Sequence, residues 1–480
     1  MSWDNHKRAW SLGLVCFCAA CQASPEDAGA DAGAGADETD ASLLDAEADD
    51  ESPRDADEPR VPADGGETDA DDEADVADAT DPLRAVTITS IGTDLTYYAT
   101  FQSHNQRVVS TAGGYFMGYL LSRNDSAGGG QWRISRSIDA GLTWTPLYTS
   151  ATTGSSPPAL ATDPDGNLYA ASVNFLDASR PAYITKWSAG DYSLVATGTY
   201  PGFGGAGKYT LVYDECRDQL VYASYDGQLL VVDPDDLGAS TSHRVMSSAG
   251  EHAWAQYPHL FMVGCELYHA WTTSFSSTSY YSIHAAKSPD GGTSWFQLQA
   301  EACDGSDEWW TRNEAWRLPS PFNPDDTPPS STQVSYTEEN GAHTWLSNMI
   351  VHRGKIHFAY WAQTYGDVYT RFDDGPGYRE CTQRGPTGAT VRPGLFGAFF
   401  VQDGDALYLV GGDSEGRIAV IRSDDNGDSW SDFALSEETF GTIYAVSGSP
   451  RLTLDGNIVG MFTDQRGEIG DAYFFRVQTR

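Results

Sequence analysis

SIDAGLTW (residues 137–144), SPDGGTSW (288–295) and SDDNGDSW (423–430) are three copies of one eight-residue pattern in this sequence. Each copy reads S-x-D-x-G-x-x-W and follows a run of residues typical of a β-strand. In such an octet the Ser and Asp side chains accept hydrogen bonds from the turn's own amides, the Gly adopts a positive φ, and the Trp buries a large ring. The three octets therefore predict three tight turns of the same design.

A longer repeat runs through the chain from about Val86 onward. Each unit combines an apolar strand, a Gly/Asp turn and a second strand rich in aromatic and small residues, and the units recur roughly every 50 residues, as propeller blades do. The units are Arg107–Leu120, Pro158–Ala171, Tyr209–Ala223, Tyr257–Trp271, Met349–Tyr360, Gly397–Leu409 and Pro450–Gly460. They predict an all-β propeller of four-stranded blades, with seven blades favoured. Six is the alternative, because the third unit has no octet, and Val86–Tyr98 is expected to close the last blade.

The composition agrees with many short strands joined by Gly-rich turns. Aromatic residues make up 12% of the 480 residues, and the chain contains 49 Gly. A chain of this length can form one large repeat fold.

The net charge of −39 is unevenly distributed. The tract Gln22–Pro82 carries 23 acidic residues against two Arg, a net charge of −21, and it contains no aromatic residue. Such a tract cannot bury enough apolar surface to fold, so we predict a disordered linker over residues 22–83, acting as a tether or as a solubilising tail. The remaining domain is moderately acidic, which argues against a nucleic-acid partner.

The N-terminus has the features of an export signal. Lys7 and Arg8 precede an apolar run over residues 9–21 that is short for a membrane span. The end of this run, Cys18-Ala19-Ala20-Cys21, resembles a bacterial lipobox, which predicts a signal peptide over residues 1–21 and lipidation of Cys21. Ordinary signal cleavage is the alternative. We expect an exported protein, anchored to the bacterial envelope or cell surface or secreted, with its globular domain over residues 84–480.

Four Cys remain in the predicted domain: Cys216, Cys265, Cys303 and Cys381. An even number in an exported chain permits two disulfides, with three pairings open, and buried free thiols are the alternative. The spacings are too wide for a zinc site, and no metal or cofactor is expected.

The octets resemble the Asp boxes, or BNR repeats, of the sialidase-like β-propellers. In sialidases an arginine triad binds the substrate carboxylate, an Asp is the acid/base, and a Glu activates a Tyr nucleophile. The resemblance implies Arg107, Arg317 and Arg417 as the triad, Arg123 as a second basic residue, Asp125 as the acid, Glu314 (or Glu301) as the activating Glu, and Tyr444 as the nucleophile.

The chain also departs from the sialidase pattern. The usual Arg-Ile-Pro opening reads Arg107-Val108-Val109, and Asp125 follows Arg123 too closely. Ser449-Pro450 stands where the nucleophilic Tyr is expected.

A second set of polar residues precedes or begins the predicted innermost strands. It consists of His104, His252, Tyr257, His259, His343 and Arg392. Polysaccharide lyases with similar propellers use His and Tyr to remove a proton next to a uronate carboxylate, so this set would suit that chemistry. Singly, each His would also serve as an ordinary hydrogen-bonding residue. The long interval between the fourth and fifth units adds Trp310, which we expect on a binding surface.

Three classes of function follow from these residues. The favoured class is a glycoside hydrolase acting on acidic glycans, with lyase chemistry as a variant. The second is a surface propeller that binds glycan or protein without catalysis, and the third is a structural scaffold. A monomer with an acidic glycan partner is expected.

Overall fold

The computed structural model describes residues 82–101, 104–121, 130–150, 156–174, 177–205, 207–246, 254–276, 279–298, 321, 334, 344–362, 366–373, 379–380, 391, 397–467 and 469–480. Residues Leu83–Arg480 belong to one compact unit. Within the described residues every regular element is a β-strand, so the predicted all-β class is confirmed. The described part contains no helix long and apolar enough to cross a bilayer.

Five sheets of the described unit each contain four consecutive, antiparallel strands. Short turns of two to five residues connect many of these strands, as the Gly-rich sequence predicts. The strands are β2 (Val108–Thr111), β3 (Gly114–Leu120), β4 (Trp132–Ser137) and β5 (Thr145–Thr149); β6 (Ala159–Thr162), β7 (Leu168–Val173), β8 (Ala182–Trp187) and β9 (Leu194–Tyr200); β10 (Tyr209–Asp214), β11 (Gln219–Ser224), β12 (Gln228–Val232) and β13 (Ser240–Arg244); β14 (Trp254–Val263), β15 (Glu266–Ser276), β16 (Ser279–Ser288) and β17 (Phe296–Gln297); β18 (Thr344–His352), β19 (Lys355–Ala362), β20 (Gly366–Asp373) and β21 (Arg379–Glu380).

A sixth sheet has eight strands in the order β22-β23-β24-β25-β1-β28-β27-β26. Its strands are β22 (Ala398–Asp403), β23 (Ala406–Gly412), β24 (Ile418–Ser423), β25 (Ser431–Leu435), β1 (Arg84–Thr96), β26 (Ile443–Gly448), β27 (Asn457–Arg466) and β28 (Ile469–Gln478). Strand β1 pairs antiparallel with β28 from Val86 to Thr96, and parallel with β25 at Arg84 and Ala85. The N-terminal end of the domain therefore adds the outer strand to the last set of strands, as predicted for Val86–Tyr98.

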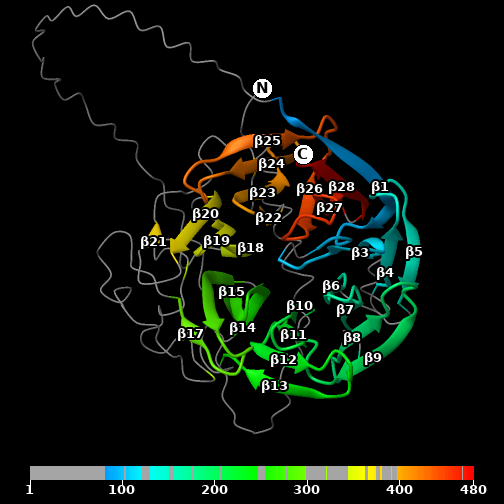
Figure 1. Cartoon of the computed structure of the whole chain (residues 1–480), viewed down its shortest axis with the longest axis vertical. Helices are drawn as coiled ribbons and strands as arrows, with labels where there is room; N and C mark the ends of the chain where they lie inside the picture. The colour runs from blue at the N-terminus through cyan, green and yellow to red at the C-terminus, as the bar shows by residue number, and fades with distance from the viewer. Residues whose placement is uncertain are drawn as a thin grey trace, which may run out of the picture. The chain divides into compact units, whose positions relative to one another are not determined.

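The first strands of the strand sets contact one another in sequence. Strand β2 contacts β6, β6 contacts β10, and the series continues through β14, β18, β22 and β26 back to β2. In Figure 1 these strands lie innermost and the last strands of the sets lie at the periphery. We call the side at which the first strands begin the entry side. Because the strands alternate in direction, the turns that follow the first and third strands lie on the opposite side.

The apolar core lies between neighbouring sheets. One buried cluster joins Phe261, Ile350 and Phe400 from three successive first strands. Another joins Met117 of β3 to Met461 and Phe474 of the last strand set, so the circuit is closed by apolar packing as well. This packing fixes where each first strand begins, and thereby positions the residues that precede those strands.

Each octet forms the turn between the third and fourth strands of its set, and the predicted side-chain hydrogen bonds are present. In residues 137–144 the Gly141 amide donates to Ser137 Oγ at 2.8 Å, and the Thr143 amide donates to Asp139 Oδ1 at 2.9 Å. The same pair of bonds occurs in 288–295 and 423–430. Gly141 has a φ of +86°, and a Cβ there would meet the ring of Phe474, so the turn requires glycine.

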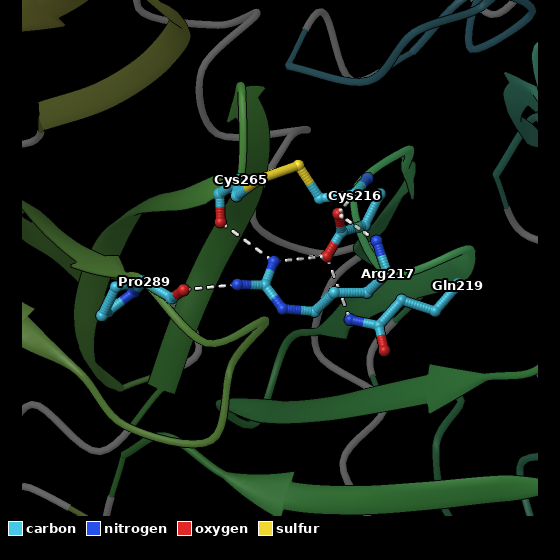
Figure 2. The surroundings of a disulfide bond; sticks show 6 residues. Cys216, Arg217, Gln219, Cys265 and Pro289 are labelled. Atoms are coloured by element: carbon cyan, nitrogen blue, oxygen red, sulfur yellow. Dashed lines mark hydrogen bonds and ion pairs between the residues drawn. A yellow bond between two sulfur atoms is a disulfide. The ribbon is translucent and has the colours of Figure 1, made fainter.

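Cys216 and Cys265 form a disulfide between the β10–β11 turn and the β14–β15 turn (Figure 2). Arg217 reinforces this junction, because its guanidinium binds Asp214, the carbonyl of Cys265 and the carbonyl of Pro289. The disulfide selects one of the three predicted pairings. Cys303 and Cys381 lie outside the described residues.

Candidate functional site

Residues 97–101 and 104–107, which we call the 97–107 segment, lie between β1 and β2 at the starts of several first strands. The amide of Phe101 donates to the carbonyl of Tyr98 at 3.0 Å, and Thr100 Oγ1 donates to the carbonyl of Tyr444 at 3.2 Å. Ser447 of β26 binds the carbonyl of Asn105. These bonds bring the side chains of Phe101, His104 and Arg107 to the centre of the entry side.

Aromatic rings from different sheets meet around this segment. The ring of Phe101 is stacked on Tyr444 of β26, with 6.0 Å between centroids, and lies 6.4 Å from Tyr257 of β14. Tyr257 in turn lies 6.1 Å from Trp345 of β18. Tyr257 and Tyr444 are buried, whereas Phe101 and Trp345 are partly exposed. The centre of the entry side therefore presents aromatic surface to solvent.

A buried lysine lies beneath these rings. Lys208 is 3% exposed, its ammonium donates to Gln256 Oε1, and it lies 4.4 Å from the centroid of Tyr257. Gln256 and Tyr257 face it because β14 has an irregularity between Gln256 and His259, where Tyr257 adopts a φ of +52°. Such a bulge redirects side chains, and the ring then stabilises the ammonium by a cation–π contact.

His104 is 1% exposed and contacts the ring of Tyr257 edge-to-face, with 5.5 Å between centroids. Within the described residues neither ring nitrogen of His104 has a hydrogen-bond partner. Burial lowers the pKa of His104 well below its usual value, and the charges of Arg107, His259 and Lys208 lower that pKa further. The imidazole is therefore neutral near pH 7, with one nitrogen as donor and the other as acceptor.

His259 fixes the backbone of His104. One ring nitrogen of His259 faces the carbonyl of His104, and the other lies 2.8 Å from the carbonyl of Met349. Burial lowers the pKa of His259, while the two carbonyl acceptors act in the opposite direction because they favour the doubly protonated ring. This side chain thus joins the 97–107 segment to β14 and β18.

Arg107 is fully buried and also holds the segment in place. Its Nη1 donates to the carbonyl of Pro157, and its Nη2 donates to the carbonyl of Phe101 at 3.1 Å. Burial lowers the pKa of Arg107 to about 10, so it stays charged at neutral pH. These two bonds use one N–H of each terminal nitrogen, and the part in an arginine triad that the resemblance implies for Arg107 stays a prediction. We refer to His104, Arg107, Lys208 and Tyr257 as the central cluster.

Arg417 lies in the turn between β23 and β24. Its guanidinium binds Asp413 at 2.8 Å and Glu415 at 3.0 Å. Both partners belong to the same turn, so the structure gives Arg417 a local role and leaves its predicted part in an arginine triad as a prediction.

The structure brings five of the predicted residues together, since His104, Arg107, Tyr257, His259 and Tyr444 all contact Phe101 or one another. Apart from Arg417, the other predicted residues lie outside the described residues, and their roles stay predictions: Cys21, Arg123, Asp125, His252, Glu301, Trp310, Glu314, Arg317, His343 and Arg392. The described part contains no group of three His, Cys, Asp or Glu residues arranged to hold a metal ion.

The sequence reasoning missed Lys208. A signal was present, because Lys208 directly precedes β10 just as Arg107 directly precedes β2. Comparing the position before each first strand across the repeats would have identified both buried cations.

No protein-family model matches the chain, and no curated protein matches its sequence. Solved structures with similar folds include Trypanosoma rangeli sialidase with the inhibitor DANA, at 9% identity and a TM-score of 0.43, over 82% of this chain and 60% of that one. They also include the phage phi92 endosialidase, at 9% identity and a TM-score of 0.43, over 83% of this chain and 70% of that one. The RRP9 WD40 repeats match at 11% identity and a TM-score of 0.44, over 83% of this chain and 99% of that one. The strand order and the circuit of first strands define the class: an all-β, propeller-like arrangement of four-stranded sheets.

Proposed function

We propose that this chain is an exported, sialidase-like β-propeller that binds an acidic glycan at the centre of its entry side. The observation that supports this function is the central cluster, where Lys208 lies over the ring of Tyr257 and Arg107 donates to the carbonyl of Phe101, whose ring lies beside Tyr257. Sugar rings pack on aromatic faces, and a carboxylate needs fixed cations beside it. The combination suits a carbohydrate that carries a negative charge.

The charge of the rest of the chain makes this combination informative. The net charge is −39, so the protein as a whole repels anions. A buried group of cations in such a chain is costly to maintain, and anion recognition supplies a reason for it.

Hydrolysis of that glycan is the second candidate function. The specific observation in its favour is Tyr444, the predicted nucleophile, which stacks on Phe101 beside the central cluster. Catalysis would also need Asp125 as the acid and Glu314 as the group that activates the phenol. In this proposal the hydrolase uses the same binding site.

We further propose that the domain has seven blades. This number is supported by the sheet order, because five sheets have four strands and the eight-stranded sheet consists of two four-strand sets joined where β1 meets β25.

Export completes the proposal: residues 1–21 are a signal peptide with lipidation at Cys21, residues 22–83 are a linker, and residues 84–480 are a monomeric propeller. The Cys216–Cys265 disulfide supports export, since such bonds persist in oxidising compartments. Metabolic labelling with a fatty acid should mark the chain, and Cys21→Ala should abolish the label. A labelled Cys21→Ala variant would contradict the anchor.

The binding function is tested by titrating the purified chain with sialylated and glucuronate-terminated oligosaccharides, each beside its neutral counterpart. We expect preference for at least one acidic glycan, and release of its terminal sugar if Tyr444 acts as a nucleophile. Trp345→Ala should weaken binding, whereas Trp144→Ala, which alters a partly exposed Trp on the opposite side, should not. No preference for any acidic glycan would overturn the proposal.

A further inference from the structure

We infer that Lys208 and His104 bind the carboxylate of the glycan, and that Lys208 is the residue that discriminates acidic from neutral ligands. This inference rests on the proposed function and assigns its charge recognition to a residue outside the predicted arginine triad. Both side chains lie against the ring of Tyr257, with Lys208 Nζ 4.4 Å and the His104 ring 5.5 Å from its centroid.

Lys208 is suited to this role by its donors and its surroundings. An ammonium group carries three N–H donors, so Lys208 can bind Gln256 and a ligand oxygen at the same time. The cation–π contact with Tyr257 and the bond to Gln256 hold the ammonium in one place. A positioned charge of this kind discriminates a carboxylate from an uncharged group more strongly than a mobile surface lysine does.

His104 provides the second, independent observation. Its two ring nitrogens are buried and have no partner among the described residues, an arrangement that is costly unless a ligand supplies the missing hydrogen bonds. Its neutral ring can donate a hydrogen bond to one carboxylate oxygen, and because it carries no charge it does not repel the ammonium of Lys208. The ring is fixed from behind, because His259 binds the carbonyl of His104.

Arg107 is anchored to the backbone. Each of its terminal nitrogens donates one N–H to a backbone carbonyl, and the Pro157 carbonyl also accepts from the hydroxyl of Tyr209 at 2.9 Å. In this assignment Arg107 contributes positive potential and holds the 97–107 segment, while Lys208 and His104 contact the ligand. The partly exposed rings of Phe101 and Trp345, both next to Tyr257, form the side from which the ligand approaches.

The test compares one acidic oligosaccharide that the parent chain binds with the same oligosaccharide after reduction of its carboxylate to an alcohol. Lys208→Met keeps most of the length of the side chain and removes the charge. We expect Lys208→Met to weaken binding of the acidic form by about tenfold or more, as for loss of a charged hydrogen bond, and to leave the reduced form within about twofold. Lys208→Arg should restore part of the preference, and His104→Phe should lower it by about tenfold.

The matched control is Lys186→Met. Lys186 also lies over a tyrosine, 5.6 Å from the centroid of Tyr169, but it binds Pro234 and Asp235 away from the central cluster. This variant should keep the full preference for the acidic form. General damage to the fold would weaken the binding of both the acidic and the reduced oligosaccharide, and would lower the thermal unfolding temperature of Lys208→Met.

The outcomes separate the two proposals. If the parent prefers the acidic form and Lys208→Met keeps that preference, the assignment of Lys208 is overturned while the proposed function stands. If the parent shows no preference for any acidic form, the proposed function fails, and the assignment fails with it.

Discussion

Arg217 donates a hydrogen bond to the carbonyl oxygen of Cys265, 2.9 Å away, although the two residues belong to neighbouring sheets (Figure 2). The same guanidinium pairs with Asp214, whose carboxylate is fully buried, at 2.8 Å. The disulfide and this hydrogen bond thus connect the same two turns, and the ion pair with Asp214 holds the guanidinium in place from within its own turn.

Arg217→Ala should lower the free energy of unfolding by about 2–3 kcal/mol, because it leaves the buried carboxylate of Asp214 without its cation. Arg353→Ala is the matched control. Arg353 also joins the turns of neighbouring sheets, through Asp405 at 3.6 Å, but both side chains are largely exposed. Its loss should cost about 0.5 kcal/mol or less. Urea denaturation measures both values, and equal costs would contradict this account.

Replacing both Cys216 and Cys265 by Ser should destabilise the domain further. The disulfide closes a loop with a sequence separation of 49, and the chain-entropy relation for such a loop gives about 4 kcal/mol. Reduction should lower the urea midpoint of the parent protein, because it breaks the same disulfide. In the double variant this disulfide is already missing, so its loss adds nothing to the effect of reduction there. An unaltered midpoint in the double variant would argue against a stabilising role.

The tryptophans of the octets should differ in their contribution to stability, although the octets share one pattern. Trp295 is 1% exposed, whereas Trp144 is only partly buried. We expect Trp295→Ala to cost about 3–5 kcal/mol and Trp144→Ala about 1–2 kcal/mol, because the half-buried ring loses less apolar contact. Thermal unfolding of the two variants checks the order, and a larger loss for Trp144→Ala would contradict it.

His269 should make the domain sensitive to mild acid. Its ring lies 4.8 Å from that of Trp271, and neither of its nitrogens has a partner among the described residues. Burial, and to a smaller extent the charge of His259, lowers the pKa of His269 to about 3. An unfolded histidine has a pKa near 6.5, so the unfolded chain binds the proton first as the pH falls.

The contribution of His269 to stability is therefore complete above pH 6.5 and is lost as the pH falls toward 3. Between pH 7 and pH 5 the loss from this residue alone is about 2 kcal/mol. His269→Leu should remove that part of the pH dependence and, by eliminating two buried polar atoms without partners, raise stability at pH 7. The measurement is the urea midpoint of parent and variant at pH 7 and pH 5. An equal change of the midpoint with pH in both proteins would refute the assignment to His269.

Local patterns predicted the parts of the fold that depend on neighbouring residues in the chain. The octets predicted the turns because the hydrogen bonds from the turn amides to the Ser and Asp side chains form within eight residues, as between Gly141 and Ser137. The closing strand was also foreseeable, since the last repeat supplies only three strands, β26–β28, and Val86–Thr96 completes the set.

Contacts between sheets were less accessible to sequence reasoning. Arg107 binds the carbonyl of Pro157, 50 residues further along the chain, and no local pattern reveals this contact between sheets. Lys208 is important only because a bulge at Tyr257 in the next sheet turns two side chains toward it. The pairing of Cys216 with Cys265 likewise depends on which turns become neighbours.

Strand β1 is the segment through which the N-terminal part of the chain joins the domain, and it is also hydrogen-bonded to β25 and β28. A protease cut after Thr96 would leave the outer edge of β28 exposed, a ready template for unwanted association with another chain. Shortened versions of the protein for crystallisation should consequently begin before Arg84. A force applied through the N-terminal residues would act first on this strand. The hydrogen bonds between β1 and β28 would therefore have to break before the rest of the domain is pulled apart.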